Sequence, residues 1–304
     1  MKPKSTPKPH HLQPLSPTEE EILKVMSTYR YMTAVDVAHC LFSPKSLTHV
    51  RSILTRLAGG DDYKERNCLF RVPMPSAEAG NRERIFTLGS VGREVVQSLG
   101  IPVDWYYRPS KTGRLSGSYL AHQLLLTRFV ICACRFTSQH PDYTLADVKL
   151  CYELEKRLPR REGEAIVPDA WLHFERVSDG VRFPVLVEID RGSEFQERYK
   201  NHVRGRLEFI RSGDYARVFG TPAVMIAYAT TGRIQEHAES RRKTMGAWTM
   251  EVLRELEIES WAGIFRFTSA VEYKTLYEDG HQLFTQPVWH RPDSPAAPLP
   301  LLGS

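Results

Sequence analysis

Two short apolar segments that carry carboxylates are the most informative part of this sequence. They read Ile166-Val167-Pro168-Asp169-Ala170-Trp171-Leu172-His173-Phe174 and Pro184-Val185-Leu186-Val187-Glu188-Ile189-Asp190-Arg191-Gly192. Both are rich in β-branched and aromatic residues, and the turn-forming Ser178-Asp179-Gly180 lies between them, which predicts neighbouring strands of one sheet. Because side chains alternate along a strand, Glu188 and Asp190 should share a face.

The carboxylates in these strands are the candidate functional groups of the chain. If Asp169 lies across from Glu188 and Asp190, three carboxylates converge and raise one another's pKa unless a cation lies among them. Mg²⁺, or Mn²⁺ in its place, is the oxygen-seeking cation that suits such a set. The alternative is an ion-pair network of Glu188 and Asp190-Arg191 with Arg198 or Arg204, and spacing does not decide between the two.

Composition places the chain among ordinary globular proteins. It has 304 residues, 41% hydrophobic and 25% charged, which is enough for two domains, and its net charge of +5 is compatible with nucleic acid without requiring it. Its five cysteines form no CxxC pair, which suits a reduced compartment. No apolar stretch approaches the ~20 residues needed to span a bilayer. We therefore expect a cytoplasmic protein without a membrane partner.

The pattern along the chain predicts two domains between mobile ends. Pro-rich ends with little to bury indicate a disordered basic tail and a flexible C-terminal tail, and a stretch rich in Pro, Gly and Ser indicates a linker. The predicted parts are a tail at 1–15, a first domain at 16–100, a linker at 101–118, a second domain at 119–290 and a tail at 291–304.

The first domain reads as three helices, a β-hairpin and a closing helix. The expected helices run from Ser16 to Tyr29, Thr33 to Leu41 and Pro44 to Leu57, the strands are Leu69–Val72 and Arg84–Leu88, and the last helix runs from Ser90 to Leu99. This order is that of the winged variant of the helix-turn-helix fold.

The third helix of this domain carries the predicted DNA-binding residues. Its apolar residues Leu47, Val50, Ile53, Leu54 and Leu57 form a buried face. The outward set, with two arginines at the hairpin, is Ser46, Thr48, His49, Arg51, Ser52, Thr55, Arg56, Arg82 and Arg84. These side chains suit bases and phosphates, which predicts binding of double-stranded DNA. The alternative is a solvated polar helix in a winged domain that binds protein.

The second domain alternates helices and strands. The expected elements are a helix at 119–138, a helix at 146–158, the two acidic strands, a helix at 194–212, a strand at 223–228, a helix at 234–256 and a strand at 264–267. This order predicts an α/β domain with a mixed sheet flanked by helices, in a chain that is α+β overall.

The second domain resembles the PD-(D/E)XK nuclease-like core. Residues 16–270, the winged helix included, resemble the replication-relaxation family of plasmids and other mobile elements. The signature is Pro168-Asp169 with Glu188-Ile189-Asp190-Arg191-Gly192-Ser193-Glu194 and the Arg/Lys-rich helix that follows. The resemblance implies a DNA-binding protein of plasmid replication and DNA relaxation, with replication or mobilisation proteins as partners. A homodimer is compatible with it.

The resemblance also implies roles for the acidic residues. In an active nuclease of this fold, Asp169 and Glu188 would hold magnesium, and lysine would stand where this chain has Asp190. Lys200 in the next helix could supply the missing ammonium, or Arg191 could act electrostatically. A helix glutamate, Glu153 or Glu155, could assist.

Three hypotheses follow for the function. The first is a DNA-binding protein that reads duplex DNA with its winged helix and engages backbone through the basic helix from Glu194 to Arg211. The second is a magnesium-dependent endonuclease or nickase that uses Asp169, Glu188 and Asp190 with Lys200. The third is a regulator of transcription or of a toxin pair that retains a relic nuclease fold.

Overall fold

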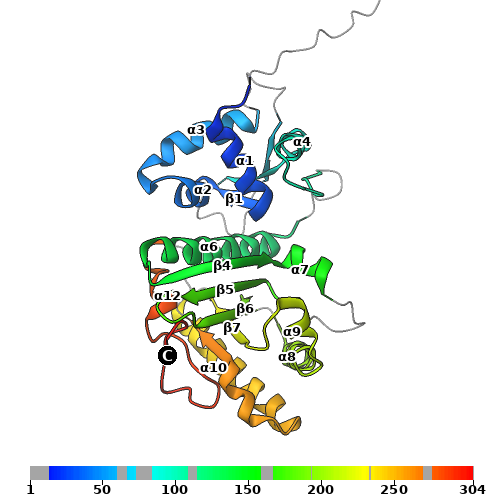
Figure 1. The fold of residues 1–304 in the computed structure, drawn as a ribbon, viewed down its shortest axis with the longest axis vertical. Coiled ribbons are helices and arrows are strands. Elements are labelled where there is room, and N and C mark those ends of the chain that lie inside the picture. The colour runs from blue at the N-terminus through cyan, green and yellow to red at the C-terminus, as the bar shows by residue number, and fades with distance from the viewer. Residues whose placement is uncertain are drawn as a thin grey trace, which may run out of the picture. The chain divides into compact units, whose positions relative to one another are not determined.

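The computed structural model describes residues 14–59, 67–72, 84–108, 115–158, 167–192, 194–232, 234–269 and 276–303. The chain forms two compact units, Met1–Thr127 and Arg128–Ser304, and the described residues of each contain one sheet (Figure 1). The predicted α/β class is confirmed. The predicted N-terminal tail lies almost wholly outside the described residues.

The first unit follows the predicted order of elements. Its helices are α1 (Pro17–Tyr29), α2 (Ala34–Leu41), α3 (Leu47–Leu57) and α4 (Ser90–Ser98), with a 3-10 turn at Pro44–Ser46. Its strands are β1 (Tyr31–Thr33), β2 (Leu69–Val72) and β3 (Ile85–Leu88), and they form an antiparallel sheet in the order β1-β3-β2. The short strand β1 was not predicted, because three residues directly before a helix give no alternating pattern.

Local capping explains where the first helices begin. The Ser16 side chain accepts a hydrogen bond from the Glu19 backbone N–H, and the Glu19 carboxylate accepts one from Ser16. Thr33 and Asp36 repeat this reciprocal capping at the start of α2. Such boxes satisfy backbone donors that a helix leaves unpaired, so both starts are set by the sequence.

The segment predicted to be a linker begins as part of the first unit. Val103 and Tyr107 are buried. The Tyr107 backbone N–H donates to the Leu88 carbonyl at 2.8 Å, and the Gln97 side chain donates to the Val103 carbonyl at 2.7 Å. Aromatic and apolar anchors therefore hold residues 101–108 in place, and the division between the units falls within the next helix, α6 (Gly117–Gln139).

The second unit is built on a five-stranded sheet. Its strands are β4 (Tyr143–Leu150), β5 (Ala170–Arg176), β6 (Arg182–Asp190), β7 (Met225–Thr230) and β8 (Phe265–Thr268), in that order. The pairs β4·β5 and β5·β6 are antiparallel, and β6·β7 and β7·β8 are parallel. The predicted mixed sheet is confirmed.

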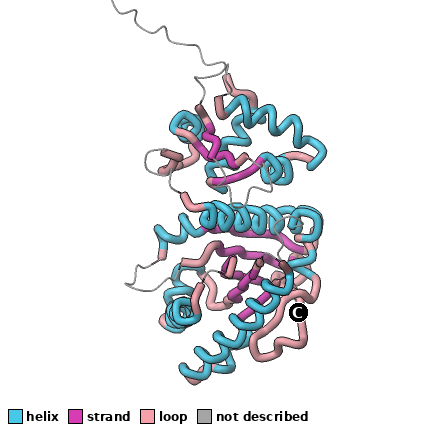
Figure 2. The backbone as a smooth tube through the Cα atoms, turned by 180° about the vertical axis from the view of Figure 1, so that it is seen from behind, coloured by secondary structure: helices cyan, strands magenta, loops and turns pink. Residues whose placement is uncertain are grey.

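Helices lie on both sides of this sheet (Figure 2). Those that follow α6 are α7 (Cys151–Arg157), α8 (Gln196–Arg211), α9 (Asp214–Phe219), α10 (Gln235–Glu255), α11 (Leu276–Asp279) and α12 (Gln282–Thr285), with a 3-10 segment at Glu259–Ile264. On one face, Tyr199 of α8 and Met245 of α10 share a core with Tyr228 of β7. On the other, Phe284 of α12 contacts Phe129 of α6 and Phe174 of β5.

The prediction of a helix at 146–158 is wrong in its first part. Residues Tyr143–Leu150 form β4, which pairs with β5 from Tyr143↔Arg176 to Leu150↔Ala170, and only Cys151–Arg157 are helical. A register shift between Leu145 and Asp147 breaks the alternation of this strand. Pairing with β5, rather than local periodicity, determines its conformation.

The C-terminal segment is also not the mobile tail that its composition suggested. Leu301 and Leu302 are buried. Leu299 and Trp289 exchange backbone hydrogen bonds at 2.7 and 3.1 Å, and the Leu302 N–H donates to the Phe284 carbonyl at 2.8 Å. Leu301 and Leu302 anchor residues that are otherwise rich in Pro and Ala, because burying them removes apolar surface from water.

Candidate functional site

The acidic residues meet where β5 begins and β6 ends. Ala170 pairs with Val187, which places Asp169 beside the end of β6. The Asp169 backbone N–H donates to the Val187 carbonyl at 3.1 Å, and its Oδ2 accepts from the Ile189 N–H at 2.7 Å. Asp169 thus holds the two strands together and lies near enough to Glu188 to affect its ionisation.

Glu188 forms an ion pair with Arg206 of α8. Its side chain is 13% exposed and that of Arg206 is 4% exposed. Burial raises the pKa of Glu188 to about 8; the attraction of Arg206 opposes this shift and the repulsion of Asp169 adds to it. Burial alone would lower the pKa of Arg206, but the charge of Glu188 outweighs it and the net shift is upward. A guanidinium therefore occupies the space beside the Glu188 carboxylate.

Asp190 pairs with a different arginine on a different helix. Arg241 of α10 donates from Nε and Nη2 to the two carboxylate oxygens at 2.9 and 3.0 Å. Oδ2 also accepts from the Gly192 N–H at 3.0 Å. Gly192 has φ +76°, a conformation that glycine adopts without strain, and the strand ends there. Glu188 and Asp190 point to the same face, as alternation predicts, but toward separate cations.

A third polar group beside this cluster was missed in the sequence. Glu194 lies 3.0 Å from His202 Nδ1 and 3.7 Å from Arg198 Nε. Burial would raise the pKa of Glu194, but the hydrogen bond from His202 and the nearby positive charges outweigh it, so the pKa is lowered. Arg198, His202 and Arg206 are spaced by four on α8 and thus share one face. That spacing is the signal that could have identified the group.

Lys200 does not serve the acidic cluster. Its ammonium lies 2.7 Å from Glu251 and 3.6 Å from Glu255, both on α10. Arg204, one helical turn further on, pairs with Glu255 at 2.6 Å. The prediction that Lys200 would replace the missing lysine is therefore not met, because this side of α8 faces α10. Lys200 and Arg204 tie α8 to α10, while Arg198 of the same helix is 72% exposed.

Other residues near the acidic cluster have local roles. The Glu153 carboxylate accepts from the Leu150 N–H at 3.0 Å and caps α7, while Glu155 is exposed. Tyr199 is fully buried, and its hydroxyl lies 2.8 Å from that of Thr249. It is a core residue, as expected for a tyrosine on the apolar face of a helix.

A divalent metal does not fit the cluster as it is arranged. Both oxygens of Asp190 accept from Arg241, Glu188 is paired with Arg206, and Asp169 binds the backbone of β6. Within the described ranges, the structure contains no set of three or more His, Cys, Asp or Glu side chains placed to hold a metal ion. Arg206 and Arg241 supply positive charge beside these carboxylates, as in the ion-pair alternative, although the arginines differ from the Arg198 and Arg204 that were considered.

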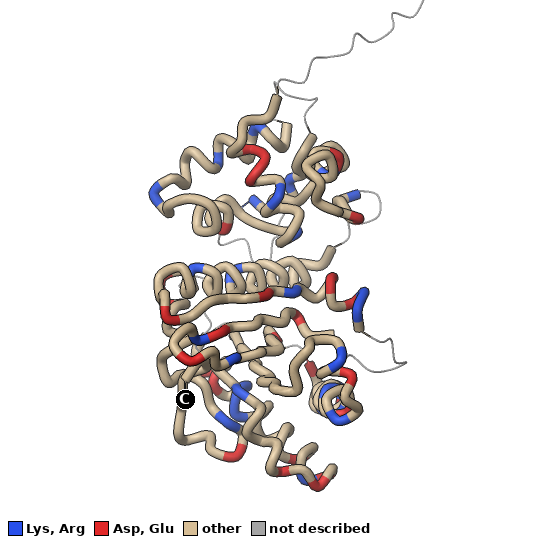
Figure 3. The backbone as a smooth tube through the Cα atoms, viewed as in Figure 1, with Lys and Arg blue, Asp and Glu red and all other residues tan. Residues whose placement is uncertain are grey.

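Helix α3 presents the second group of candidate residues. Val50, Ile53, Leu54 and Leu57 are buried, as predicted, and Leu47 is partly buried. The opposite side of the helix exposes Thr48, His49, Arg51 and Ser52, whereas Ser46 and Thr55 are half-buried. Basic positions lie along this helix (Figure 3). The sequence thus identified a helix with one buried and one polar face.

The arginines near α3 differ in their availability. Arg56 donates from Nε to Glu19 of α1 at 2.9 Å, so it joins two helices of the unit. Arg84 is exposed, and Arg82 lies outside the described residues. Two further exposed cations were missed: Lys45, just before α3, and Arg71 of β2, whose Nη2 lies 3.5 Å from the Thr55 carbonyl of α3. Lys45, Arg51 and Arg71 therefore form the basic part of the α3 surface.

A model of the family described as replication-relaxation matches residues 23–224. No curated protein and no solved structure matches the chain. Among the described helices, none combines the length and apolar content needed to cross a membrane.

Proposed function

Because the chain belongs to the replication-relaxation family, we propose that it binds duplex DNA through α3 during replication of a plasmid or mobile element. Membership of the family suggests the role in replication. The observation that supports α3 is its division into a buried apolar face and an exposed face with Thr48, His49, Arg51 and Ser52. Hydroxyl, imidazole and guanidinium groups on one exposed helix face suit base edges and phosphates.

The surroundings of α3 support the same proposal. Three helices, strands β2 and β3 and the closing helix α4 follow one another in the order of a winged helix. In that fold the helix corresponding to α3 enters the major groove, which is about 12 Å wide and admits one helix. Lys45 and Arg71 flank the helix and would contact phosphates on either side. In this proposal α3 recognises the base sequence of the DNA, and the flanking cations provide most of the affinity.

Replacing Arg51 with alanine is expected to weaken binding to duplex DNA about tenfold. The side chain is exposed, so its loss should leave folding unchanged. If Arg51 contacts a phosphate, the slope of log affinity against log salt should fall by about 1; if it contacts a base, the preference for one sequence should relax instead. Fluorescence anisotropy with a labelled duplex measures both quantities.

The matched control for this variant is Arg217→Ala. Arg217 is 71% exposed on α9 of the second unit and belongs to no proposed DNA contact. Its variant should bind DNA as the wild type does. Unchanged affinity and sequence preference in Arg51→Ala would remove α3 from the interface. Arg56→Ala is a separate case, because breaking its contact with Glu19 should lower the free energy of unfolding.

The proposal does not include cleavage of DNA. A magnesium-dependent endonuclease or nickase would need Asp169 and Glu188 as metal ligands, and the pairing of Glu188 with Arg206 opposes this. The regulator hypothesis, in which the second unit is a protein-binding platform, predicts a different salt dependence of DNA binding. DNA affinity that falls steeply with salt requires phosphate contacts, whereas a protein platform would show little DNA binding at any salt.

A further inference from the structure

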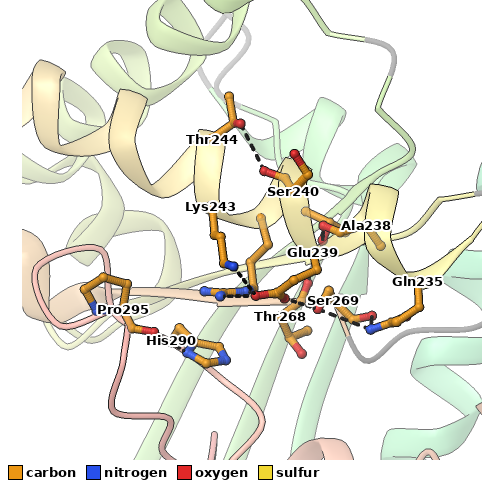
Figure 4. A network of polar contacts seen from close by, with 12 residues as sticks. Gln235, Ala238, Glu239, Ser240, Lys243, Thr244, Thr268, Ser269, His290 and Pro295 are labelled. Carbon is orange, nitrogen blue, oxygen red and sulfur yellow. Dashed lines mark hydrogen bonds and ion pairs between the residues drawn. The ribbon is translucent and has the colours of Figure 1, made fainter.

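A pocket lies between α10 and the C-terminal segment, outside the range that the family model matches. Its volume is about 690 Å³, which is within the usual range for small-molecule sites. Figure 4 shows Glu239 and Lys243 of α10 projecting toward the segment that carries His290 and Pro295. The segment that was expected to be a mobile tail therefore forms one wall of the pocket.

The charged side chains of the pocket favour an anion. Four lining residues are basic and two are acidic, which leaves a net charge of +2; the basic ones are Arg242, Lys243, Arg254 and Arg291, and the acidic ones are Glu239 and Glu251. Glu251 is already paired with Lys200 at 2.7 Å. A low-dielectric wall beside these charges strengthens their attraction for an anion.

Two of the arginines are held in position by carboxylates. Arg242 donates from Nε and Nη2 to Glu239 at 2.8 and 2.5 Å, and Arg291 donates from the same two atoms to Asp293 at 2.9 and 2.5 Å. Each pairing leaves Nη1 without a hydrogen-bond acceptor among the described residues. A guanidinium fixed in this way keeps two N–H groups for a ligand and loses little freedom on binding.

Glu239 is itself well fixed. It accepts from the Ser269 hydroxyl at 2.7 Å and lies 3.6 Å from the Lys243 ammonium. The hydrogen bonds from Arg242 lower its pKa to about 2, and Ser269 adds to the effect. The carboxylate therefore stays ionised, and Arg242 keeps its orientation over the whole physiological pH range.

His290 adds an acceptor to the pocket. Its Nδ1 lies 2.8 Å from the Pro295 carbonyl, which can only accept, so Nδ1 carries the proton. Burial lowers the pKa of His290. The neutral ring thus leaves Nε2 with a lone pair, which can accept a hydrogen bond from a hydroxyl or an N–H group of a ligand.

The remaining walls are apolar. They are formed by Gly246, Ala247, Met250, Phe267, Pro292, Pro295 and Ala296. Gly246 has only Pro292 within 4 Å of the position that a Cβ would take, at 3.9 Å, so the helix leaves open space there. Fixed cations on one side and apolar walls on the other fit a ligand with a phosphate and a flat, largely apolar body.

We propose that this pocket binds a nucleoside phosphate. The phosphate would lie against Arg242, Lys243 and Arg291, the sugar or base would donate to His290, and the base would pack on Met250. The inference is independent of the role of α3. The ligand could be a free nucleotide or the 5′-phosphorylated end of a DNA strand, since both present the same chemistry.

Isothermal titration of the full chain with dTMP tests the proposal. We expect saturable binding at one site and at least about tenfold weaker binding to Lys243→Glu, because one attractive charge becomes repulsive. Lys243 is 65% exposed, so this variant should fold normally. Arg217→Glu, which reverses an equally exposed charge on α9, should bind as the wild type does.

A second variant and a second ligand complete the test. Ala247→Trp places a large ring at an exposed pocket position and should also weaken dTMP binding. Tighter binding of a 5′-phosphorylated trinucleotide than of dTMP would support a strand end, and the reverse order would support a free nucleotide. No saturable dTMP binding, or binding that both variants leave unchanged, would overturn the proposal. The Arg51→Ala variant should bind dTMP as the wild type does. A failure of the nucleotide proposal can therefore be distinguished from a failure of the α3 proposal.

Discussion

Replacing Glu188 with leucine should destabilise the protein by about 3 kcal/mol or more, whereas replacing Arg206 with methionine should cost much less. The reason is that the two partners of this buried pair differ chemically. A guanidinium keeps its proton at all accessible pH values, so Glu188→Leu leaves a charge buried without its counterion. A carboxyl group can instead take up a proton, so Arg206→Met leaves a neutral Glu188.

Urea unfolding at pH 9, where the Glu188 carboxylate is ionised in the folded chain, measures this asymmetry. The two single variants and the double variant Glu188→Leu/Arg206→Met should be compared with the wild type. The double variant should be more stable than Glu188→Leu alone, because it removes both charges and fills the space with apolar side chains. Equal losses in the two single variants, or a larger loss in Arg206→Met, would contradict the assignment of Arg206 as the resident cation.

The same pair predicts a pH dependence of stability. The pKa of Glu188 is about 8 in the folded chain and near the ordinary value of 4.5 in the unfolded chain. Between these values the folded state holds a proton that the unfolded state has lost. The free energy of unfolding should therefore decrease as pH rises through this window and level off above it.

Glu188→Gln isolates this contribution, because glutamine cannot ionise. Between pH 5 and pH 9 the free energy of unfolding of the wild type should fall by about 4 kcal/mol more than that of the variant. Unfolding curves at several pH values give the difference directly, since all other titrating groups are shared. If the free energies of unfolding of the two proteins differ by the same amount at every pH, the pKa of Glu188 is not raised. If the wild type instead gains stability relative to the variant as pH rises below 5, Arg206 lowers the pKa of Glu188.

The acidic cluster connects the central strand to two helices of the second unit. Arg206 connects β6 to α8, and Arg241 connects β6 to α10. Each bridge joins the end of the central strand to one of the helices that cover the sheet. The cluster therefore holds two layers of the second unit together, and the proposed contact with DNA is left to α3 of the first unit.

Much of the fold could be predicted because local patterns determine it. Ser16 and Thr33 stand at helix starts with an acidic residue three positions later, and the structure shows both capping boxes. The spacing of Val50, Ile53 and Leu54 marked the buried face of α3. Alternation placed Glu188 and Asp190 on one face of β6, and their ion pairs with α8 and α10 agree.

The rest depends on contacts between distant residues. Arg241 lies 51 positions from Asp190, so no spacing rule connects them. Residues 143–150 form a strand because they pair with β5. Leu301 and Leu302 are buried only because the second unit offers a surface for them. The sequence places Lys200 on α8. It does not determine the direction in which this side chain points, because that depends on the packing of α10.

Incubation of the purified chain with supercoiled plasmid carrying its own origin region distinguishes DNA binding from DNA cleavage in one experiment. Samples with magnesium or manganese, with EDTA, and with the Glu188→Ala variant are analysed on one gel at several salt concentrations. We expect intact supercoiled plasmid in every lane and a mobility shift that disappears as salt rises. Absence of a shift at low salt would show that the chain does not bind DNA, and nicked or linear plasmid that requires both the metal and Glu188 would show that the acidic cluster is catalytic.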